Sequence, residues 1–249
     1  MARNEDVFSG RRALLRVTGC GAVLLASSPL VAFAATASGA ASIKIATIGA
    51  GHIGGALGSL WARLGHPVMF SSRHPEELKS LVDGLGGAAR AGTTTEAIAF
   101  ADAVLLAVPY RALPEIGKEH AAALAAKALV LDACNPIPGR DGEIATWARE
   151  KGAGVATEEL LPGAKLVRAF NAISAGRLSQ IRTQAERVGM PMAGDDATAL
   201  RLASQLVREI GLEPVVIGPL AMGRYLIPGT PLAGEHTPDQ IRTIVATLR

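Results

Sequence analysis

The sequence of 249 residues has little that would cross-link the chain or draw it to nucleic acid. It contains two cysteines, Cys20 and Cys134, and aromatic residues make up only 4% of it. No pair of cysteines or histidines has metal-ligand spacing, so no zinc site is expected. The 25 basic and 22 acidic residues leave a formal net charge of only +3. This near balance implies no nucleic-acid partner.

The sequence also lacks an apolar run long enough to cross a membrane as a helix. The longest apolar stretch runs from about Gly19 to Ala34 and contains Ser27, Ser28 and Pro29. It falls short of the roughly 20 residues that a spanning helix needs. We therefore expect no permanent membrane anchor.

The residues around this stretch are typical of an export signal. Arg11 and Arg12 precede it in "SGRRALLR", a pattern similar to the twin-arginine class. Small residues near its end, up to about residue 37, offer cleavage sites. We therefore predict a cleavable signal over residues 1–37 and an exported protein, periplasmic or extracellular. The alternative is a cytoplasmic protein with an N-terminal extension.

The rest of the chain, residues 42–249, is predicted to be a single domain. Removing Met1 to Ala34 removes four arginines and two acidic residues, so the formal charge falls from +3 to +1. Cys134 is then the one remaining thiol, which excludes an intramolecular disulfide and leaves stability to the core. The many alanines are compatible with a homodimer, although no interface motif is visible.

Short apolar segments alternate with longer amphipathic ones throughout this domain. The candidate strands are 43–48, 68–70, 103–108, 128–133, 165–170 and 214–217. The candidate helices are 53–64, 75–85, 94–100, 112–126, 142–151 and 197–210. Alternation of this kind predicts an α/β fold, a Rossmann-type doubly wound and mainly parallel sheet with helices on both faces. The segment 223–238, rich in glycine and proline, is expected to be an irregular loop.

Three glycines follow the first strand in "IKIATIGAGHIGGALG". Gly49, Gly51 and Gly54 have the GxGxxG spacing, and the segment that follows, from Ile53, opens a helix. In this context the first glycine permits a tight turn, the second allows a pyrophosphate to approach, and the third allows close packing. The sequence therefore predicts a dinucleotide site on this loop, with His52 able to donate near the phosphates or to point at solvent.

The end of the second strand predicts which dinucleotide binds. An NAD site usually places a carboxylate about 20 residues after the glycines. Here the sequence reads "FSSRHP", in which Ser71 and Ser72 offer hydroxyls and Arg73 offers a guanidinium for a 2′-phosphate. We therefore predict a preference for NADP, the alternative being a solvated arginine at a strand end.

Later strand ends supply further candidates. Val108, Pro109 and Tyr110 follow one strand and are expected to border the cofactor crevice, although Tyr110 could equally be an ordinary loop aromatic. Asn135 follows the next strand, where its amide either binds the nicotinamide ribose or carboxamide or organises the turn. Cys134 is expected to be a packed residue, because no general base accompanies it.

The sequence resembles the NADP oxidoreductases that depend on the deazaflavin coenzyme F420. The motifs that carry this resemblance are "IGAGHIGGALG", "SSRHPEEL", "ADAVLLAVPYRALPEI", "VLDACNPI", "GAKLVRAFNAIS", "MAGDDATAL" and "EIGLEPVVIGPL". A looser resemblance extends to pyrroline-5-carboxylate reductases and STEAP-type metalloreductases. The family implies one NADP-binding domain with a short C-terminal extension, with F420 or a flavin as co-substrate. The chain departs from it in lacking a second basic residue directly after Arg73, with Lys79 as a distant substitute.

The resemblance also implies where the second substrate binds. Asn171, at the end of a further strand, together with Ala172 and Ile173 is implied to form the wall at which hydride is transferred, the alternative for Asn171 being turn formation. Leu226, Ile227 and Pro228 correspond to the family segment that closes over the deazaflavin.

No general acid or base stands out among these residues. Hydride transfer between a nicotinamide and a flavin-like ring needs alignment and exclusion of water rather than a protein acid. Reduction of a ketone or imine would usually need one. The sequence therefore favours a small-molecule redox acceptor of the deazaflavin or flavin type. The alternatives are an NADPH-dependent metal or imine reductase and a non-catalytic NADP-binding sensor or accessory protein.

Overall fold

The computed structural model describes residues 42–178, 180 and 187–248. The predicted export signal lies outside these residues. Ala40–Arg249 forms one compact unit. No helix in the described part of the chain is both long enough and apolar enough to span a membrane.

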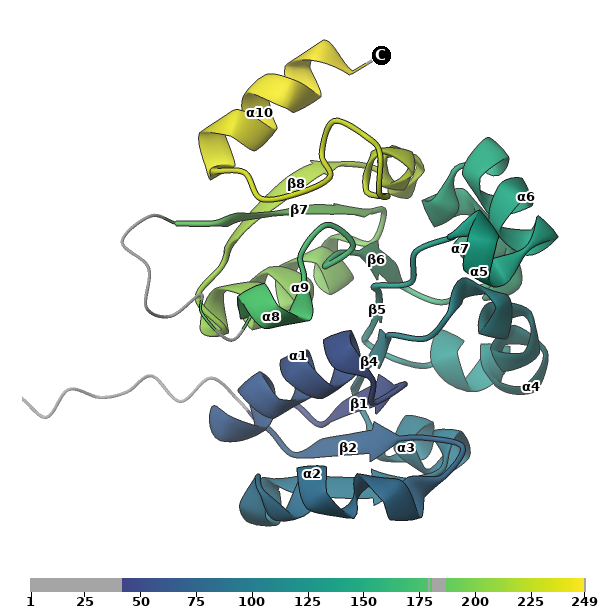
Figure 1. Cartoon of the computed structure of the whole chain (residues 1–249), viewed down its shortest axis with the longest axis vertical. Helices are drawn as coiled ribbons and strands as arrows, with labels where there is room; N and C mark the ends of the chain where they lie inside the picture. The colour runs from purple at the N-terminus through teal and green to yellow at the C-terminus, as the bar shows by residue number, and fades with distance from the viewer. Residues whose placement is uncertain (1–41, 179, 181–186, 249) are drawn as a thin grey trace, which may run out of the picture. The chain divides into compact units, whose positions relative to one another are not determined.

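One eight-stranded sheet forms the centre of the unit (Figure 1). The strands lie in the order β3-β2-β1-β4-β5-β6-β7-β8, and all neighbouring pairs are parallel except β6 and β7. Their bounds are β1 Ile45–Ile48, β2 Val68–Ser71, β3 Ala89–Gly92, β4 Ala103–Leu106, β5 Leu129–Asp132, β6 Leu166–Arg168, β7 Gly189–Gly194 and β8 Glu213–Gly218. The order reverses between β1 and β4, which confirms the predicted doubly wound, mainly parallel sheet.

Helices cover both faces of this sheet. The α-helices are α1 His52–Arg63, α2 Lys79–Asp83, α3 Thr94–Phe100, α4 Leu113–Ala125, α5 Pro138–Asp141, α6 Glu143–Lys151, α7 Ala153–Leu160, α8 Ala175–Leu178, α9 Ala197–Glu209 and α10 Pro238–Thr247. The short 3-10 helices are η1 Pro75–Leu78, η2 Gly86–Ala88, η3 Tyr110–Ala112 and η5 Leu220–Tyr225. In Figure 1, α10 lies beside β8 at the end of the sheet away from β2.

The apolar strands are buried on both faces because alternate residues enter different cores. Ile45 of β1 joins the cluster that α1 and α9 close with Leu57 and Leu206. The next residue, Ala46, joins the opposite cluster, which α4 closes with Leu113. The central strands β1, β4 and β5 are therefore buried at every residue.

The sequence did not predict two of the strands. The edge strand β3, "ARAG", is short and partly exposed, so it lacks an apolar pattern. The strand β7, "GMPMAG", contains two glycines and Pro191, which normally disfavour an inner strand. Only Ala193 and Gly194 pair with β6, so Pro191 lies beyond the end of β6. The N–H that proline lacks is therefore not needed for pairing with β6.

Most predicted helices are confirmed within one or two residues. The segment 75–85 divides into η1 and α2, while α5, α7, α8 and α10 were not predicted. The expected irregular loop is confirmed in its larger part, since η5 ends at Tyr225 and α10 begins at Pro238.

The register brings six strand ends to one level. The residues that pair across the sheet at this level are, in sheet order, Gly92, Ser71, Ile48, Leu106, Asp132 and Arg168. We call this row of residues, with the loops that follow them, the carboxyl edge. Ligands of open α/β sheets bind at such an edge. The predicted site residues on the loops after β1, β2, β4, β5 and β6 therefore share it.

Candidate functional site

The three glycines of the loop after β1 have three different surroundings. Gly49 has φ +92° and a Cβ on it would lie 2.6 Å from the Ala107 carbonyl oxygen. A Cβ on Gly54 would lie 1.9 Å from the Gly49 carbonyl oxygen. A Cβ on Gly51, by contrast, would meet no protein atom within 4 Å. The first and third glycines are thus required by the fold, and the space beside Gly51 is free for a ligand.

The N-terminus of α1 has no side-chain cap. Its N-cap residue is Gly51, and no acidic residue lies in its first turn. Helices α3, α9 and α10 are instead capped by the side chains of Thr93, Asp196 and Thr237. The first N–H groups of α1 and the positive end of its dipole are therefore available to an anion such as a pyrophosphate.

The end of β2 presents a cation, Arg73, that is free among the described residues. Ser71 is 1% exposed and its Oγ has no hydrogen-bond partner, while Ser72 Oγ accepts a hydrogen bond of 3.1 Å from the His74 N–H. Arg73 is exposed and has no ion pair or hydrogen bond with the described residues. Lys79 donates to Asp83 over 2.6 Å, so it is already paired. Arg73 is thus the residue here best placed to meet a phosphate.

The side chain of Tyr110 is turned into the core and not toward the carboxyl edge. Tyr110 is fully buried, and its hydroxyl lies 3.1 Å from Thr157 Oγ1 on α7. Burial raises the pKa of this hydroxyl well above its ordinary value, so it stays protonated. On the same loop Pro109 is exposed and Val108 is half-buried, so these two residues remain at the carboxyl edge.

A buried ion pair, which the sequence reasoning missed, lies at the ends of β5 and β6. Arg168 Nη1 donates to Asp132 Oδ2 over 2.6 Å, and the two side chains are 0% and 1% exposed. Asp132 also accepts hydrogen bonds from Thr157 Oγ1 at 2.9 Å and from the Cys134 N–H at 2.8 Å. The sequence did contain a signal for this pair. An acidic and a basic residue end two apolar strands, and a buried charge needs a partner of opposite sign.

This pair continues into the loops that follow it. Arg168 Nη2 donates to Asn135 Oδ1 over 3.3 Å, and Asn135 Nδ2 donates to the Asn171 carbonyl oxygen over 2.8 Å. The amide oxygen and the amide nitrogen of Asn135 therefore both bond to other parts of the protein, which favours the alternative that Asn135 organises the turn. Asn171 is 6% exposed and donates to the Cys134 carbonyl oxygen over 3.4 Å.

The loop after β6 is held in an unusual conformation. Phe170 has φ +67°, a positive value for a non-glycine residue, and it is 1% exposed. Ala172 is half-buried and Ile173 joins the core beside α1, so Ala172 is the more accessible of the two. Cys134 is buried as predicted, and burial raises the pKa of its thiol.

Most of the predicted substrate segment after η5 is buried. Leu226 and Ile227 are 1% and 6% exposed, and Leu226 packs into the core cluster that α10 helps to close. The Leu226 carbonyl oxygen accepts a hydrogen bond of 3.5 Å from Arg168. Of the three predicted substrate residues only Pro228 is exposed. Leu226 and Ile227 are buried in the core instead.

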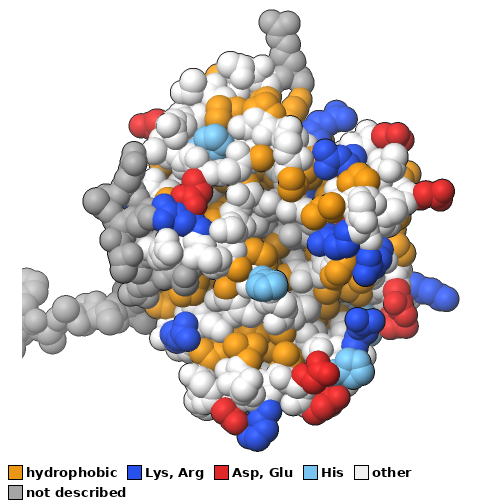
Figure 2. Space-filling model, viewed as in Figure 1, with side chains coloured by type: hydrophobic (Ala, Val, Ile, Leu, Met, Phe, Trp, Pro, Cys, Tyr) orange, Lys and Arg blue, Asp and Glu red, His pale blue; other side chains and the backbone are white. Residues whose placement is uncertain are grey.

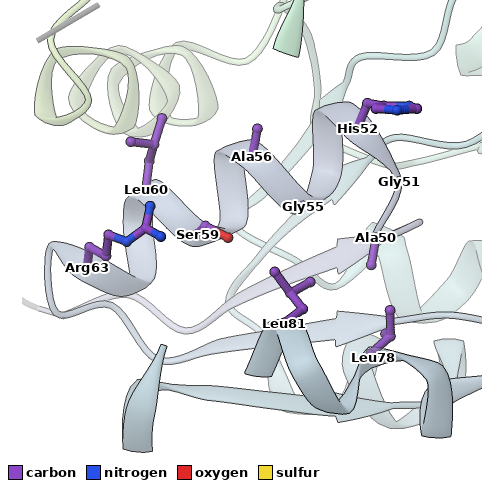
Figure 3. Close-up of a pocket in the computed structure, with 10 residues that line it drawn as sticks. All are labelled: Ala50, Gly51, His52, Gly55, Ala56, Ser59, Leu60, Arg63, Leu78 and Leu81. Carbon is purple, nitrogen blue, oxygen red and sulfur yellow. The ribbon is translucent and has the colours of Figure 1, made fainter. Parts of the chain in front are cut away.

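A cavity of about 570 Å³ lies along α1, and it is not the predicted crevice (Figure 3). Leu78 and Leu81 project toward α1 across it, and it extends back as far as Arg63. Only its end, at Ala50 to His52, reaches the carboxyl edge. We place a dinucleotide at the edge because the free donors of α1 and Arg73 lie there, whereas the cavity wall is mainly apolar.

No set of three or more His, Cys, Asp or Glu side chains in the described part of the chain is arranged to hold a metal ion. The residues that do converge at the edge fit a dinucleotide instead. Gly51 leaves room for a pyrophosphate, the first turn of α1 offers N–H donors, and Arg73 offers a cation nearby.

Comparison with known proteins identifies the same part of the chain. Residues 44–136 match the model of the family described as NADP oxidoreductase, coenzyme F420-dependent. This segment runs from the residue before β1 to the loop after β5. It contains the glycine loop, Arg73 and Asn135.

Solved structures with the same fold cover more of the chain. The hypothetical protein SMa0349 of Sinorhizobium meliloti is 28% identical with a TM-score of 0.64, over 79% of this chain and 96% of that one. A candidate F420-dependent NADP reductase of Arthrobacter sp. FB24 is 20% identical with a TM-score of 0.63, over 74% and 88%. A pyrroline-5-carboxylate reductase of Coxiella burnetii is 16% identical with a TM-score of 0.53, over 71% and 60%. At 20% and 16% identity, the last two matches concern the fold alone.

Proposed function

We propose that the chain transfers hydride between NADPH and a deazaflavin or flavin-like acceptor. Its residues 44–136 match the model of the F420-dependent NADP oxidoreductases. The observation that carries this proposal is the combination at one edge of an uncapped helix N-terminus and an unpaired arginine. The first turn of α1 would hold the pyrophosphate, and Arg73 would hold the 2′-phosphate.

The side chains at the other end of the edge support hydride transfer without a protein acid. Asp132, Cys134 and Tyr110 are each at most 1% exposed, so none of them can reach a reacting atom. What these residues do is fix the loops after β5 and β6. Positioning of that kind is what transfer between two rings requires, and the nicotinamide supplies the hydride.

The test of the cofactor assignment is the variant Arg73→Ala. We expect the KM for NADPH to rise about tenfold or more, and the KM for NADH to change little, because only NADPH carries the extra phosphate. Arg63→Ala is the matched control, an exposed arginine on α1 away from the carboxyl edge. Equal changes for both nucleotides would contradict the assignment.

The acceptor is tested with NADPH at saturating concentration. Coenzyme F420, FMN, a ferric chelate and a cyclic imine are offered in turn, and the absorbance of the reduced nicotinamide is followed. Turnover with F420 or FMN supports the proposal. Turnover with the imine or the chelate alone would replace it by the alternative reductases.

A second candidate function is NADP binding without turnover, as a sensor or accessory protein. It is favoured by the burial of Leu226 and Ile227 and by the internal use of the Asn135 amide. The family resemblance implies that Leu226 and Ile227 face the acceptor, and the Asn135 amide was a candidate for binding the nicotinamide. Tight binding of NADPH with no oxidation by any acceptor of the panel would select this function.

For the location of the protein we keep export through a twin-arginine signal as a proposal. It rests on Arg11 and Arg12 before the apolar stretch. Loading with NADP before transport would explain how an exported chain obtains a cofactor made inside the cell. Fractionation of cells that express the chain with both arginines changed to lysine tests this, and unchanged export would contradict it.

A further inference from the structure

The cavity along α1 exists because α2 is much shorter than the helix it lies beside. Helix α1 has 12 residues and α2 has 5, so η1 and α2 leave part of the flank of α1 uncovered. On the face drawn in Figure 2, hydrophobic side chains gather between the places where Figure 1 labels α1 and α2. The volume of about 570 Å³ lies in the range of small-molecule sites.

The walls of this cavity are apolar along most of its length. Leu78 and Leu81 project into it from η1 and α2, and Leu60 lines it from α1 (Figure 3). His52 and Arg63 lie at its two ends, and among the described residues no acidic side chain lines it. An ion in the middle of the cavity would lose hydration without gaining a partner. The walls therefore favour an uncharged ligand.

One polar group in the middle of the cavity has no partner. Ser59 lines the cavity and is only 7% exposed. A serine inside a helix can bond to the carbonyl oxygen four residues before it, as Ser204 Oγ does to Leu200 over 2.7 Å. Ser59 Oγ has no hydrogen bond with any described residue. Its hydroxyl is therefore free to donate to a ligand inside the cavity.

The cavity overlaps the place proposed for the dinucleotide at one end only. Residues 50–52 belong both to the cavity and to the glycine loop. Arg73, which is proposed to hold the 2′-phosphate, does not line the cavity. Ser59 lies about two helical turns beyond the first turn of α1. A nucleotide held at that first turn would therefore leave the middle of the cavity free.

We infer that the cavity along α1 is a second binding site, for an uncharged and mainly apolar small molecule that carries a carbonyl oxygen. The leucines of the wall bury the apolar part of this molecule, and the Ser59 hydroxyl donates to its oxygen. The inference goes beyond the proposed function and does not depend on it.

Acetophenone and ethylbenzene provide the test, because they share a ring and a two-carbon chain and differ by the carbonyl oxygen. Backbone amide shifts in NMR spectra of the full chain give the dissociation constants and show whether α1 and α2 are the elements contacted. We expect acetophenone to bind with a dissociation constant of about 1 mM. Ser59→Ala should raise this value roughly three- to tenfold and leave the value for ethylbenzene unchanged.

Ser80→Ala is the matched control, an exposed serine of α2 that does not line the cavity, and it should change neither value. Leu81→Trp should prevent both compounds from binding, because the larger side chain fills the cavity. In urea, Ser59→Ala should be as stable as the unmodified protein, since its hydroxyl has no protein partner to lose.

The absence of shifts in α1 with either compound would overturn the inference, and so would an unchanged dissociation constant for acetophenone in Ser59→Ala. Displacement of acetophenone by NADPH would assign the cavity to the cofactor and overturn it as well. Simultaneous binding of acetophenone and NADPH would support it. A chain that oxidises NADPH with no acceptor would fail the proposed function and leave this inference standing.

Discussion

The two ends of the carboxyl edge use their polar groups differently. At the glycine loop and Arg73, the first N–H groups of α1 and one guanidinium have no partner among the described residues. At the ends of β5 and β6, Asp132, Arg168 and Asn135 bond to one another and to neighbouring loops. The first end offers its groups to a ligand, and the second uses most of them to hold the fold.

This difference explains which parts of the site the sequence predicted. A dinucleotide is held largely by backbone groups, so spaced glycines between a strand and a helix were enough to place it. The acceptor end depends on side chains whose partners lie far away in the sequence, such as Arg168 with Asp132 and Tyr110 with Thr157. Such pairings appear only once the strands are in register, so the burial of Tyr110 and Leu226 was not predicted.

The largest expected effect comes from breaking the buried ion pair with Arg168→Leu. This leaves the Asp132 carboxylate buried without its cation, which costs roughly 3–5 kcal/mol. Unfolding in urea measures the loss. The double variant Asp132→Asn with Arg168→Leu is the control, since it removes the stranded charge and should recover part of the stability. A loss below about 1 kcal/mol in the single variant would mean that the pair does not join the two ends as described.

A smaller loss of stability is expected from Gly54→Ala. The new Cβ would lie 1.9 Å from the Gly49 carbonyl oxygen, so the loop and α1 must move apart. Such overpacking costs roughly 1–3 kcal/mol. Binding of NADPH should fall as well, because the displaced loop carries the donors. Urea unfolding and titration calorimetry measure the two effects, and unchanged values in both would refute the packing role of this glycine.

Gly51→Ala should separate binding from folding at the cofactor end. A Cβ here meets no protein atom within 4 Å, so stability should not change, whereas the pyrophosphate would lose its closest approach. We expect the dissociation constant for NADPH to rise about tenfold, which corresponds to ~1.4 kcal/mol. Gly139→Ala, also free of contacts, is the control and should leave both quantities unaltered. Unchanged binding of NADPH by Gly51→Ala would show that the pyrophosphate does not lie against this loop.

The fold was easier to predict than the site because its signals are local. Apolar strands such as "IATI" and "LVLD" are buried on both faces and were recognised by composition alone. The strand with Pro191 was missed because its tolerance of proline depends on how far β6 extends, which only the register reveals. In the same way, the burial of Leu226 depends on α10, a helix that the sequence reasoning did not predict.

The smallest effect concerns Asp141, the carboxylate that pairs with Arg140 over 2.8 Å. Burial alone would raise the pKa of this carboxyl, but hydrogen bonds from Arg140 and from the N–H groups of Ile137 and Arg111 outweigh it, and the pKa lies below its ordinary value. Because the pKa of Asp141 is lower in the folded than in the unfolded protein, its ionised form stabilises the fold at pH values above the unfolded pKa of about 3.9. This contribution is lost as the pH falls through the folded pKa.

Urea midpoints measured from pH 6 down to pH 3 test this. The unmodified protein should lose stability below about pH 4 more steeply than Asp141→Asn, which cannot titrate at this position. Identical pH profiles for the two proteins would show that ionised Asp141 does not stabilise the fold.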